Sequence, residues 1–456
     1  METIAFPLSK RVKLTKVPQP ESKELQFNFE TFFGDIREDK KQLRDVHCKD
    51  FYSLFEVNSN SSSLQIPFSQ VESVLFLTFA VSREMYHPLV SRGIPVVLVS
   101  DCSSNIAESI IQNDEKYPNL IRFYPRKKIF EYAYSSFHPK LILIKFKQFL
   151  RVIIGSGNLL EQDWIVWENV FISQDYPASL IESTHSFPSQ INQYLSFTLR
   201  SSTEFLLTFI NLNIKQYDFD SQQFHLISSL PARWKYDPVE NYGLNRLKQI
   251  NQTNKPNVKF TFENMSIYYL ASSVGNLNTK LILDFASCFL EDNKMAKKMT
   301  YEEKSKIMEK FHVLYPSESY VENSKFGPKS ASCLFLDKEI YDSFKFQKKA
   351  LKKYNKKTKD KKSLISHVKM FIVSNSKGTI NDDTIIYIGS HNFTTAAWGK
   401  FELDNSSVFV SNYEMGVLIP SLKESSKAKQ RLIDQFDIDF EMSEFTKDEQ
   451  PYFSKK

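Results

Sequence analysis

Stretches with strand-like and helix-like patterns of apolar residues alternate along most of the chain. Residues 94–101 form a short apolar run that ends in a polar loop, as expected of a buried parallel strand. Residues 71–79 mix apolar and polar positions ahead of an expected helix. Residues 267–271 have the pattern of the first strand of a second unit, followed by helical spacing at 280–290 and another short strand at 312–316. Strands that alternate with helices predict an α/β architecture.

One pattern of polar residues occurs in both halves of the chain. In the first half, His138 and Lys140 precede an apolar run, a second apolar run follows, and the motif Gly-Ser-x-Asn ends at Asn158. Trp164 comes shortly afterwards. A single His-x-Lys or Gly-Ser-x-Asn arises by chance in a chain of this size, so neither motif is informative alone.

The second half repeats this order. His367 and Lys369 precede two apolar runs, Gly-Ser-x-Asn ends at Asn392, and Trp398 has the same spacing from its glycine as Trp164 has in the first half. Repetition of the whole pattern over two long units indicates a diverged duplication rather than a short-period repeat. We therefore expect two similar domains that contribute to one shared site.

Paired His-x-Lys motifs suit covalent chemistry on a phosphodiester. Residues two apart on a strand face the same side, so each histidine projects together with its lysine. One histidine can attack phosphorus, while the other protonates the leaving oxygen and then activates water. The lysines and the amides of Asn158 and Asn392 can stabilise charge on the phosphate oxygens. Because lysines then act where other enzymes use Mg²⁺, and no carboxylate or Cys/His cluster stands out, we expect no metal and no cofactor.

The composition supports a folded protein, and the length is sufficient for two or three ordinary domains. The chain has 456 residues, of which 41% are hydrophobic, and a net charge of +6 that permits a nucleic-acid partner without requiring one. Its four cysteines are far apart, as is typical of reduced thiols. No apolar run approaches the roughly 18 residues of a membrane span, so we expect no membrane partner. We expect an N-terminal tail at residues 1–45, a first domain at 46–215 and a second domain at 216–456.

Two basic segments have roles that the sequence leaves open. The cluster at residues 10–14 fits a nuclear import signal, and we therefore expect localisation in the nucleus. Residues 345–362 hold ten lysines and one acid, with lysine pairs recurring every four residues, which would form one basic face on a helix. A solvated loop and a nucleic-acid contact leading to His367 are equally good interpretations of this lysine-rich segment.

With both motifs in place, the chain resembles the phospholipase D superfamily and, within it, the tyrosyl-DNA phosphodiesterases. The usual superfamily motif has an Asp five residues after the Lys, where this chain has Lys145 and Ser374. The tyrosyl-DNA phosphodiesterases lack that Asp as well and have a downstream Asn. The stretches 389–399 and 412–418 are very similar to this family, and the resemblance extends over residues 50–453. It implies two similar α-β-α sandwich domains with the active site at their interface.

The resemblance implies hydrolysis of a tyrosyl adduct at a DNA 3′ phosphate, as left by topoisomerase I. His138 would be the nucleophile, and His367 the general acid and then the general base. Glu414 would orient the nucleophilic histidine, and Asn169 stands where the family usually has a Gln that supports the other histidine. The residues implied to hold the phosphate are Lys140, Lys369, Asn158 and Asn392.

The resemblance also implies contacts with DNA. Tyr134 matches an aromatic position that stacks on a base, which suits a single-stranded 3′ end, although a core tyrosine is the alternative. Ser272, Ser273 and Ser317 match positions that contact DNA phosphates. The expected partners are DNA with a 3′-phosphotyrosyl or other 3′ adduct and the topoisomerase I-derived peptide. Because both signatures lie in one chain, we expect a monomer.

Two alternative functions stay open at this point. One is another enzyme of the superfamily, acting on phospholipids or on plain nucleic-acid diesters, against which the missing Asp argues. The other is an inactive DNA-binding scaffold, against which the presence of both histidines and both lysines argues. The range of 3′ adducts, and whether RNA is accepted, are likewise open.

Overall fold

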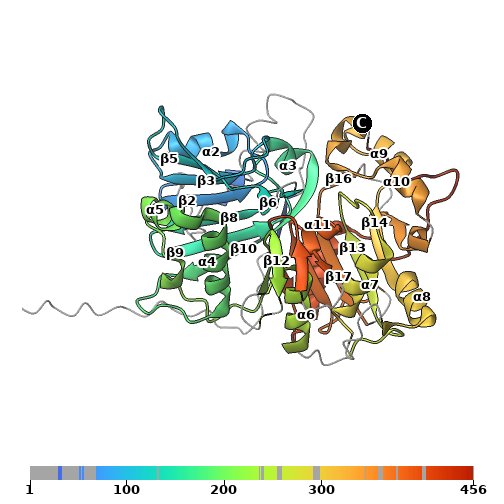
Figure 1. Ribbon diagram of the computed structural model, residues 1–456. Helices are drawn as coiled ribbons and strands as arrows, with labels where there is room; N and C mark the ends of the chain where they lie inside the picture. The colour runs from blue at the N-terminus through green and yellow to red at the C-terminus, as the bar shows by residue number, and fades with distance from the viewer. Residues whose placement is uncertain are drawn as a thin grey trace, which may run out of the picture.

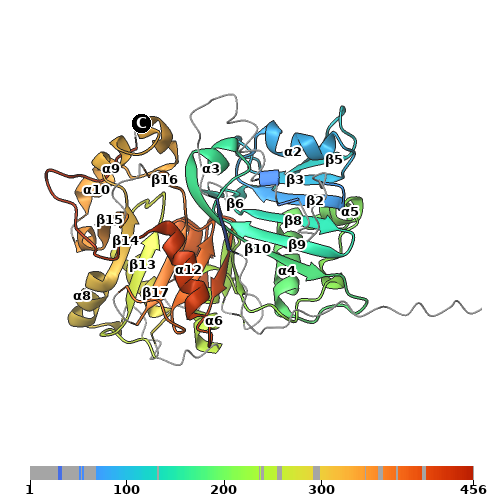
Figure 2. The ribbon, with the colours of Figure 1, turned by 180° about the vertical axis from the view of Figure 1, so that it is seen from behind.

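The computed structural model describes residues 29–32, 51–52, 54–55, 68–130, 133–235, 237, 241–253, 259–290, 298–344, 346–357, 363–375, 378–402 and 407–454. Two lobes lie side by side, each built on its own β-sheet, with the N-terminal lobe in blue to green and the C-terminal lobe in yellow to red (Figure 1). The view from behind shows the same division (Figure 2). The basic cluster at 10–14 and residues 358–362 of the lysine-rich segment lie outside the described residues.

The first lobe contains a mixed sheet with nine strands among the described residues. Eight of them, in spatial order, are β1 (Phe29–Phe32), β10 (Trp167–Pro177), β9 (Phe149–Gly155), β8 (Leu141–Phe146), β2 (Val71–Thr78), β3 (Val96–Ser100), β5 (Leu120–Tyr124) and β4 (Ile110–Asn113). The ninth, β16 (Ile365–Ser366), comes from the second half of the chain and pairs in parallel with the start of β10. The expected buried parallel strand at 94–101 is confirmed, because β3 is buried and parallel to both β2 and β5. One segment of the expected N-terminal tail, β1, is part of this sheet, because it pairs antiparallel with β10.

The second lobe contains a sheet with seven described strands. In spatial order they are β11 (His225–Ser229), β21 (Glu414–Ile419), β18 (Ile385–Gly389), β17 (Met370–Ser374), β13 (Ser266–Leu270), β14 (Phe311–Tyr315) and β15 (Leu351–Lys353). The expectation that residues 267–271 form the first strand of this unit is wrong, because β11 precedes it in the chain and pairs with β21. The expected domain boundary at 215/216 falls between β10 and β11.

Two smaller sheets accompany the main ones. One consists of β12 (Ala232–Lys235), β20 (Ser407–Val410) and β19 (Lys400–Phe401), and the other of β6 (Lys128–Phe130) and β7 (Ala133–Tyr134). The label of β6 lies near the junction of the lobes in both views (Figures 1 and 2). Phe130 of β6 stacks on Phe409 of β20, so the two small sheets contact each other there.

Helices cover both faces of the first sheet, because successive strand residues point to opposite sides. Val74 and Phe76 of β2 belong to a buried cluster with residues of α2 (Arg83–Val90), whereas Leu75 and Leu77 belong to a cluster with residues of α4 (Ser186–Leu199). The other helices of this lobe are α3 (Glu161–Ile165) and α5 (Thr203–Phe209).

The second sheet is covered in the same way. Tyr269 of β13 clusters with α7 (Thr279–Ser287) on one face, and its neighbour Tyr268 clusters with α12 (Ser426–Phe436) on the other. The remaining helices of this lobe are α6 (Gly243–Thr253), α8 (Tyr301–Lys310), α9 (Glu318–Glu322), α10 (Lys338–Ser343) and α11 (Thr395–Trp398). The predicted architecture of two α-β-α sandwiches is therefore confirmed.

One buried cluster continues from lobe to lobe. Ile154 of β9 and Ile172 of β10 belong to the same cluster as Ile388 of β18 and Val417 of β21. Strands β9 and β10 contact β18 across the interface, and β9 also contacts β21. Close packing of this kind transmits strain and resists sliding, so residues contributed by the two lobes are held in a fixed relation.

The lysine-rich segment, for which a solvated loop and a nucleic-acid contact were equally good interpretations, does not form a helix with one basic face in its described part. Its described part contains a short 3₁₀ turn and β15, and three lysines have acidic partners within the protein. Lys352 pairs with Glu444 at 2.7 Å, Lys356 with Glu168 at 2.5 Å, and Lys353 with Glu449. These lysines are committed to tertiary structure, and a nucleic-acid contact remains a prediction only for the rest of the segment.

A close approach of two strands depends on glycine in the second lobe. Gly389 and Gly416 face each other across β18 and β21, and a Cβ at Gly416 would overlap the hydroxyl of Tyr387, which hydrogen-bonds to His391. We expect Gly416→Ala to lower the free energy of unfolding by about 1–3 kcal/mol, because the tyrosine ring has no room to move in a close-packed core. Denaturant unfolding, compared with the exposed substitution Gln162→Ala on α3, measures this; equal midpoints would contradict it.

The described cysteines are free thiols, namely Cys102, Cys288 and Cys333. Burial raises the pKa of Cys333 to about 12, so this thiol stays protonated at neutral pH. Among the described residues, no helix combines the length and the apolar character needed to cross a membrane.

Candidate active site

Backbone pairing between the lobes places the two motif histidines. The amide of His138 donates to Tyr413 O at 3.0 Å, next to a parallel bridge between Phe137 and Tyr413. The amide of His367 donates to Glu168 O at 2.9 Å, next to the parallel pairing of β16 with β10. Each histidine is therefore held by a segment of the opposite lobe, and the motifs meet at the interface.

The two motif lysines are placed alike. Lys140 Nζ donates to His138 O at 2.7 Å, and Lys369 Nζ donates to His367 O at 2.6 Å. Both are buried, at 3% and 0% exposure. Burial lowers the pKa of Lys369 to about 7, and burial with the neighbouring Lys369 ammonium lowers the pKa of Lys140 well below its usual value. An anion bound between them would relieve this repulsion and favour the charged lysines.

His138 is oriented by a carboxylate from the other lobe. Its Nδ1 lies 2.8 Å from Glu414 Oε2, and the same oxygen accepts a hydrogen bond from Ser390 Oγ at 2.5 Å. Burial opposes ionisation of Glu414, but the facing His138 and Lys140 outweigh it, so the pKa of Glu414 is lowered. An ionised Glu414 accepts the Nδ1–H of His138, which leaves Nε2 as the ring nitrogen with a free lone pair.

His367 is supported by a residue that sequence reasoning missed. Its Nδ1 lies 2.8 Å from Asp163 Oδ1, and both side chains are buried. Asn169, which stands where the family usually has a Gln that supports this histidine, donates from Nδ2 to Asp163 O at 2.8 Å and to Asp163 Oδ1 at 3.2 Å. No hydrogen bond joins Asn169 to His367 in the described structure. Asn169 therefore acts on the histidine indirectly, because it holds the carboxylate that contacts it.

The reason is a difference in side-chain length at equivalent positions. Asn169 and Glu414 each accept a hydrogen bond from the serine of the nearby Gly-Ser-x-Asn motif, Ser156 at 2.8 Å and Ser390 at 2.5 Å. Glutamate reaches the histidine across the interface, whereas asparagine is one methylene shorter. Asp163, on α3, provides the carboxylate that contacts His367 instead. The short amide at position 169 was a signal in the sequence, but it did not show which residue compensates.

The two motif asparagines are held differently. Asn392 Oδ1 accepts from Ser272 Oγ at 3.3 Å and from Ser273 N at 3.1 Å, which leaves its NH₂ group to donate to a phosphate oxygen. Asn158 Nδ2 donates to Asp163 Oδ2 at 3.2 Å, and Asn158 Oδ1 is buried without a hydrogen-bond partner in the described structure. A buried oxygen without a hydrogen-bond donor makes the folded protein less stable than it would be with that hydrogen bond formed. A bound substrate or water that donates to Asn158 would therefore be stabilised.

The residues expected to contact DNA lie in different surroundings. Tyr134 on β7 is 41% exposed, as a stacking position requires. Ser272 and Ser317 are buried, and Ser317 caps α9 by accepting from Tyr320 N at 3.1 Å. Since the Ser272 hydroxyl donates to Asn392, this serine orients the amide. Direct contacts from the serines to DNA stay a prediction.

An aromatic ring lies beside each histidine. The rings of Phe79 and His138 are 5.5 Å apart, and those of Trp167 and His367 are 5.2 Å apart. Burial, opposed by Glu414, lowers the pKa of His138; burial and Lys369, opposed by Asp163, lower the pKa of His367. Both imidazoles are thus neutral without a bound anion. In the described part of the chain, no group of three or more His, Cys, Asp or Glu side chains is placed to hold a metal.

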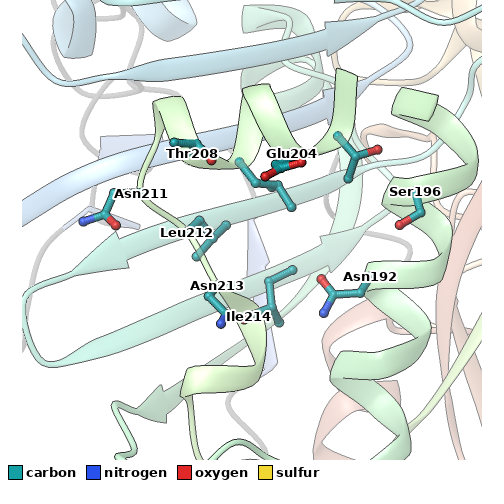
Figure 3. A pocket seen from close by; sticks show the side chains of 10 residues that line it. Asn192, Ser196, Glu204, Thr208, Asn211, Leu212, Asn213 and Ile214 are labelled. Atoms are coloured by element: carbon teal, nitrogen blue, oxygen red, sulfur yellow. The ribbon is translucent and has the colours of Figure 1, made fainter. Parts of the chain in front are cut away.

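A separate hollow lies in the first lobe between α4 and α5 (Figure 3). Its volume is about 410 Å³, and polar uncharged side chains such as Asn192, Ser196 and Thr208 line it together with Glu204. None of the signature residues belongs to it. The chemistry of the molecule is therefore concentrated at the interface and not in this hollow.

The fold and the motifs agree with comparisons to known proteins. Tyrosyl-DNA phosphodiesterase 1 of Arabidopsis thaliana is 24% identical over 346 residues, which is 72% of this chain and 53% of that protein, so the chain spans about half the length of this curated relative. The solved structure of yeast tyrosyl-DNA phosphodiesterase superposes with a TM-score of 0.60 at 15% identity, covering 86% of this chain and 90% of that one. A mutant of the yeast enzyme gives 0.63 at 13% identity, covering 86% and 88%.

At these identities the solved structures show a shared fold, and the assignment to a family comes from the sequence. The family model described as tyrosyl-DNA phosphodiesterase matches residues 69–453, which include both His-x-Lys motifs, both Gly-Ser-x-Asn motifs, Asp163 and Glu414. The chain belongs to the tyrosyl-DNA phosphodiesterase family.

Proposed function

We propose that this protein hydrolyses the bond between a tyrosine and the 3′ phosphate of DNA through a covalent intermediate on a histidine. The observation that carries the proposal is the presence of two histidine–carboxylate pairs, the partly buried His138–Glu414 and the buried His367–Asp163, beside two buried lysines. Each carboxylate holds an Nδ1, which leaves the two Nε2 atoms for chemistry at phosphorus. Family membership supports tyrosyl-DNA as the substrate.

In the first step, Nε2 of His138 attacks phosphorus, a P–N bond forms, and the P–O bond to tyrosine breaks. The electron pair of that bond stays on the phenolic oxygen, which takes a proton from Nε2 of protonated His367. The negative phosphate favours this protonated acid, because an opposite charge raises the pKa that burial lowers. Lys140, Lys369 and the amide of Asn392 donate to the non-bridging oxygens.

In the second step, neutral His367 takes a proton from a water molecule, whose oxygen attacks phosphorus. The P–N bond breaks, its electron pair returns to Nε2 of His138, and DNA with a 3′ phosphate leaves. His367 ends protonated, as it began. Glu414 stabilises the positive charge on His138 while the phosphate is attached, so the intermediate has a partner across the interface throughout.

The direct test is cleavage of a single-stranded oligonucleotide with a 3′-phosphotyrosine, in the presence of EDTA. Release of tyrosine and formation of a 3′ phosphate are expected. Parallel reactions contain a 5′-phosphotyrosyl oligonucleotide, an unmodified oligonucleotide and phosphatidylcholine vesicles. A preparation of the His138→Ala variant reports contaminating nucleases.

Cleavage of phosphatidylcholine or of the unmodified strand, with the phosphotyrosyl strand intact, would shift the assignment to another activity of the superfamily. Binding of DNA without any cleavage would support a scaffold. A reaction on the 3′-phosphotyrosyl strand that stops in EDTA would contradict the mechanism above, in which the lysines neutralise the phosphate.

The lysine pair predicts the pH dependence of substrate capture. The pKa of Lys369 is lowered to about 7, so this side chain loses its positive charge in the free protein as the pH rises above that value. We expect kcat/KM for the phosphotyrosyl substrate to fall on the alkaline side of about pH 7, since affinity for the phosphate anion declines. We expect kcat to change less, because bound phosphate keeps the ammonium charged.

Initial rates across a pH series, at low and at saturating substrate, separate the two quantities. A kcat/KM that stays flat up to about pH 9 would show that the lysines remain charged without substrate and would contradict the prediction.

A further inference from the structure

Three side chains form a row across the small sheet of the second lobe. Arg233 on β12 and Lys400 on β19 are both directly opposite Phe409 on β20. Directly opposite residues of antiparallel strands point to the same face, so the aromatic ring lies between two cations. Lys400 Nζ lies 5.9 Å from the centroid of the Phe409 ring.

The first lobe adds a second ring to this row. Phe130, on β6, stacks on Phe409 with ring centroids 5.7 Å apart and an interplanar angle of 24°. Phe130 is 48% exposed, the Arg233 side chain is 60% exposed, and Lys400 is exposed. We call Phe130, Phe409, Arg233 and Lys400 the composite patch, because it contains residues of both lobes. Phe409 is partly exposed, so the two rings form a continuous apolar surface flanked by cations, and contiguous surfaces of this kind mark interaction sites more often than single exposed rings do.

The composite patch is continuous with the candidate active site. The segment from Phe409 leads to Tyr413, whose backbone pairs with that of Phe137 and His138. Four residues of extended chain span at most about 14 Å, which is about four stacked nucleotides along a strand. The exposed Tyr134 lies on the strand paired with β6, between the patch and His138 in the sequence.

The chemistry of the patch selects one class of partner. Ring faces bind bases without regard to sequence, and cations beside them bind the phosphates that link those bases. Lys400 has no ion pair among the described residues, whereas Arg233 shares its charge with Glu402 at 2.9 Å. By contrast, the residues that line the hollow between α4 and α5 include a carboxylate, Glu204, but no cation and no aromatic ring, so the hollow lacks the stacking and positive charge of the patch (Figure 3).

We infer that the composite patch binds single-stranded nucleic acid a few nucleotides away from the scissile phosphate, and so sets the strand length that the protein prefers. The inference rests on the proposed function for the identity of the substrate, but the binding itself does not require cleavage. A strand anchored at both the patch and the site is held by both lobes at once.

The test compares two lengths of 3′-phosphotyrosyl strand, about two and about twelve nucleotides. For Phe130→Ala, and for the double variant with Phe409→Ala, we expect KM on the long strand to rise about fivefold to a hundredfold, with kcat unchanged and the short strand unaffected. Lys400→Ala is expected to make the salt dependence of binding less steep by about 0.7 in log–log slope, the value for one phosphate of a single strand. Controls are Phe205→Ala and Lys147→Ala, which remove an exposed ring and an exposed ammonium elsewhere in the first lobe.

Fluorescence anisotropy of an unmodified, labelled long strand measures the affinity of the patch for DNA in the absence of cleavage. If the wild type binds but does not cleave, and the variants bind less, the patch is supported and the proposed function fails. Equal losses on both strand lengths, or no loss on either, would overturn the inference. A loss that depends on the length of the peptide attached to the tyrosine, and not on the DNA, would overturn it in favour of a peptide surface.

Discussion

Replacing His138 with alanine is expected to abolish tyrosine release, whereas replacing His367 with alanine is expected to leave DNA covalently attached to the protein. The first variant lacks the nitrogen that attacks phosphorus. The second retains that nitrogen and its partner Glu414, but it has no base to activate water, so the phosphohistidine cannot be hydrolysed. Turnover by His367→Ala should fall by about 10²–10⁴-fold.

A denaturing gel with end-labelled DNA shows the adduct as a shifted band, and brief acid treatment should release it because a phosphorus–nitrogen bond to imidazole is acid-labile. The double variant His138→Ala/His367→Ala should give no band. His87→Ala, which removes a histidine that contacts Tyr117 on the first lobe, is the matched control and should behave as wild type. A band formed by His138→Ala would reverse the two roles, and no band from either single variant would argue against a covalent mechanism.

Changing Asp163 to asparagine is expected to lower kcat by about 10²–10⁴-fold while the protein still folds and binds DNA. Asp163 Oδ1 lies 2.8 Å from Nδ1 of His367, so its charge favours the imidazolium that protonates the leaving tyrosine. Burial opposes ionisation of this carboxyl, but the facing His367 and the Asn158 and Lys369 nearby outweigh it and lower the pKa of Asp163. An uncharged amide keeps the shape but not that electrostatic effect.

A positioning role through His367 has a kinetic signature that a general loss of structure lacks. A substrate whose leaving group is nitrophenol needs little proton donation, so the first step of Asp163→Asn should recover on it and the covalent adduct should accumulate. The double variant Asp163→Asn/Asn169→Gln, which restores the amide length usual in the family, should recover part of kcat. Gln162→Ala, on the same helix and exposed, is the control. An equal loss in the rate of the first step on both leaving groups, with no adduct accumulating, would leave Asp163 with a structural role only.

Much of the site could be predicted because its chemistry lies in short motifs. His138, Lys140 and Asn158 all belong to the first copy of the repeated motif. Because residues two apart on a strand face the same side, the spacing alone predicts that the histidine and the lysine project together. Family resemblance added Glu414, which the structure places on the nucleophilic histidine. Asp163 was not predicted as a site residue, because its partner His367 lies in the other half of the chain and no local sequence pattern indicates the contact.

The lysine-rich segment shows the opposite limit. Ten lysines at regular spacing left a solvated loop and a nucleic-acid contact equally open, and nothing in the sequence showed that Lys352, Lys353 and Lys356 pair with acidic residues remote in the chain. Such contacts are decided by the strand pairing and packing of the folded protein. The composition of the segment could be read from the sequence, but the partners of its lysines could not.

The sequence by itself determined the α/β class, the duplication and the histidine, lysine and asparagine residues of the candidate site, because periodicity and motif order are local properties of the chain. Only the tertiary structure decided that β11 opens the second sheet, that Asp163 rather than Asn169 touches His367, and that Phe130 stacks between lobes on Phe409. The physical reason is that a strand's alternation defines which side each residue faces, whereas its neighbour and register depend on packing between segments far apart in the chain.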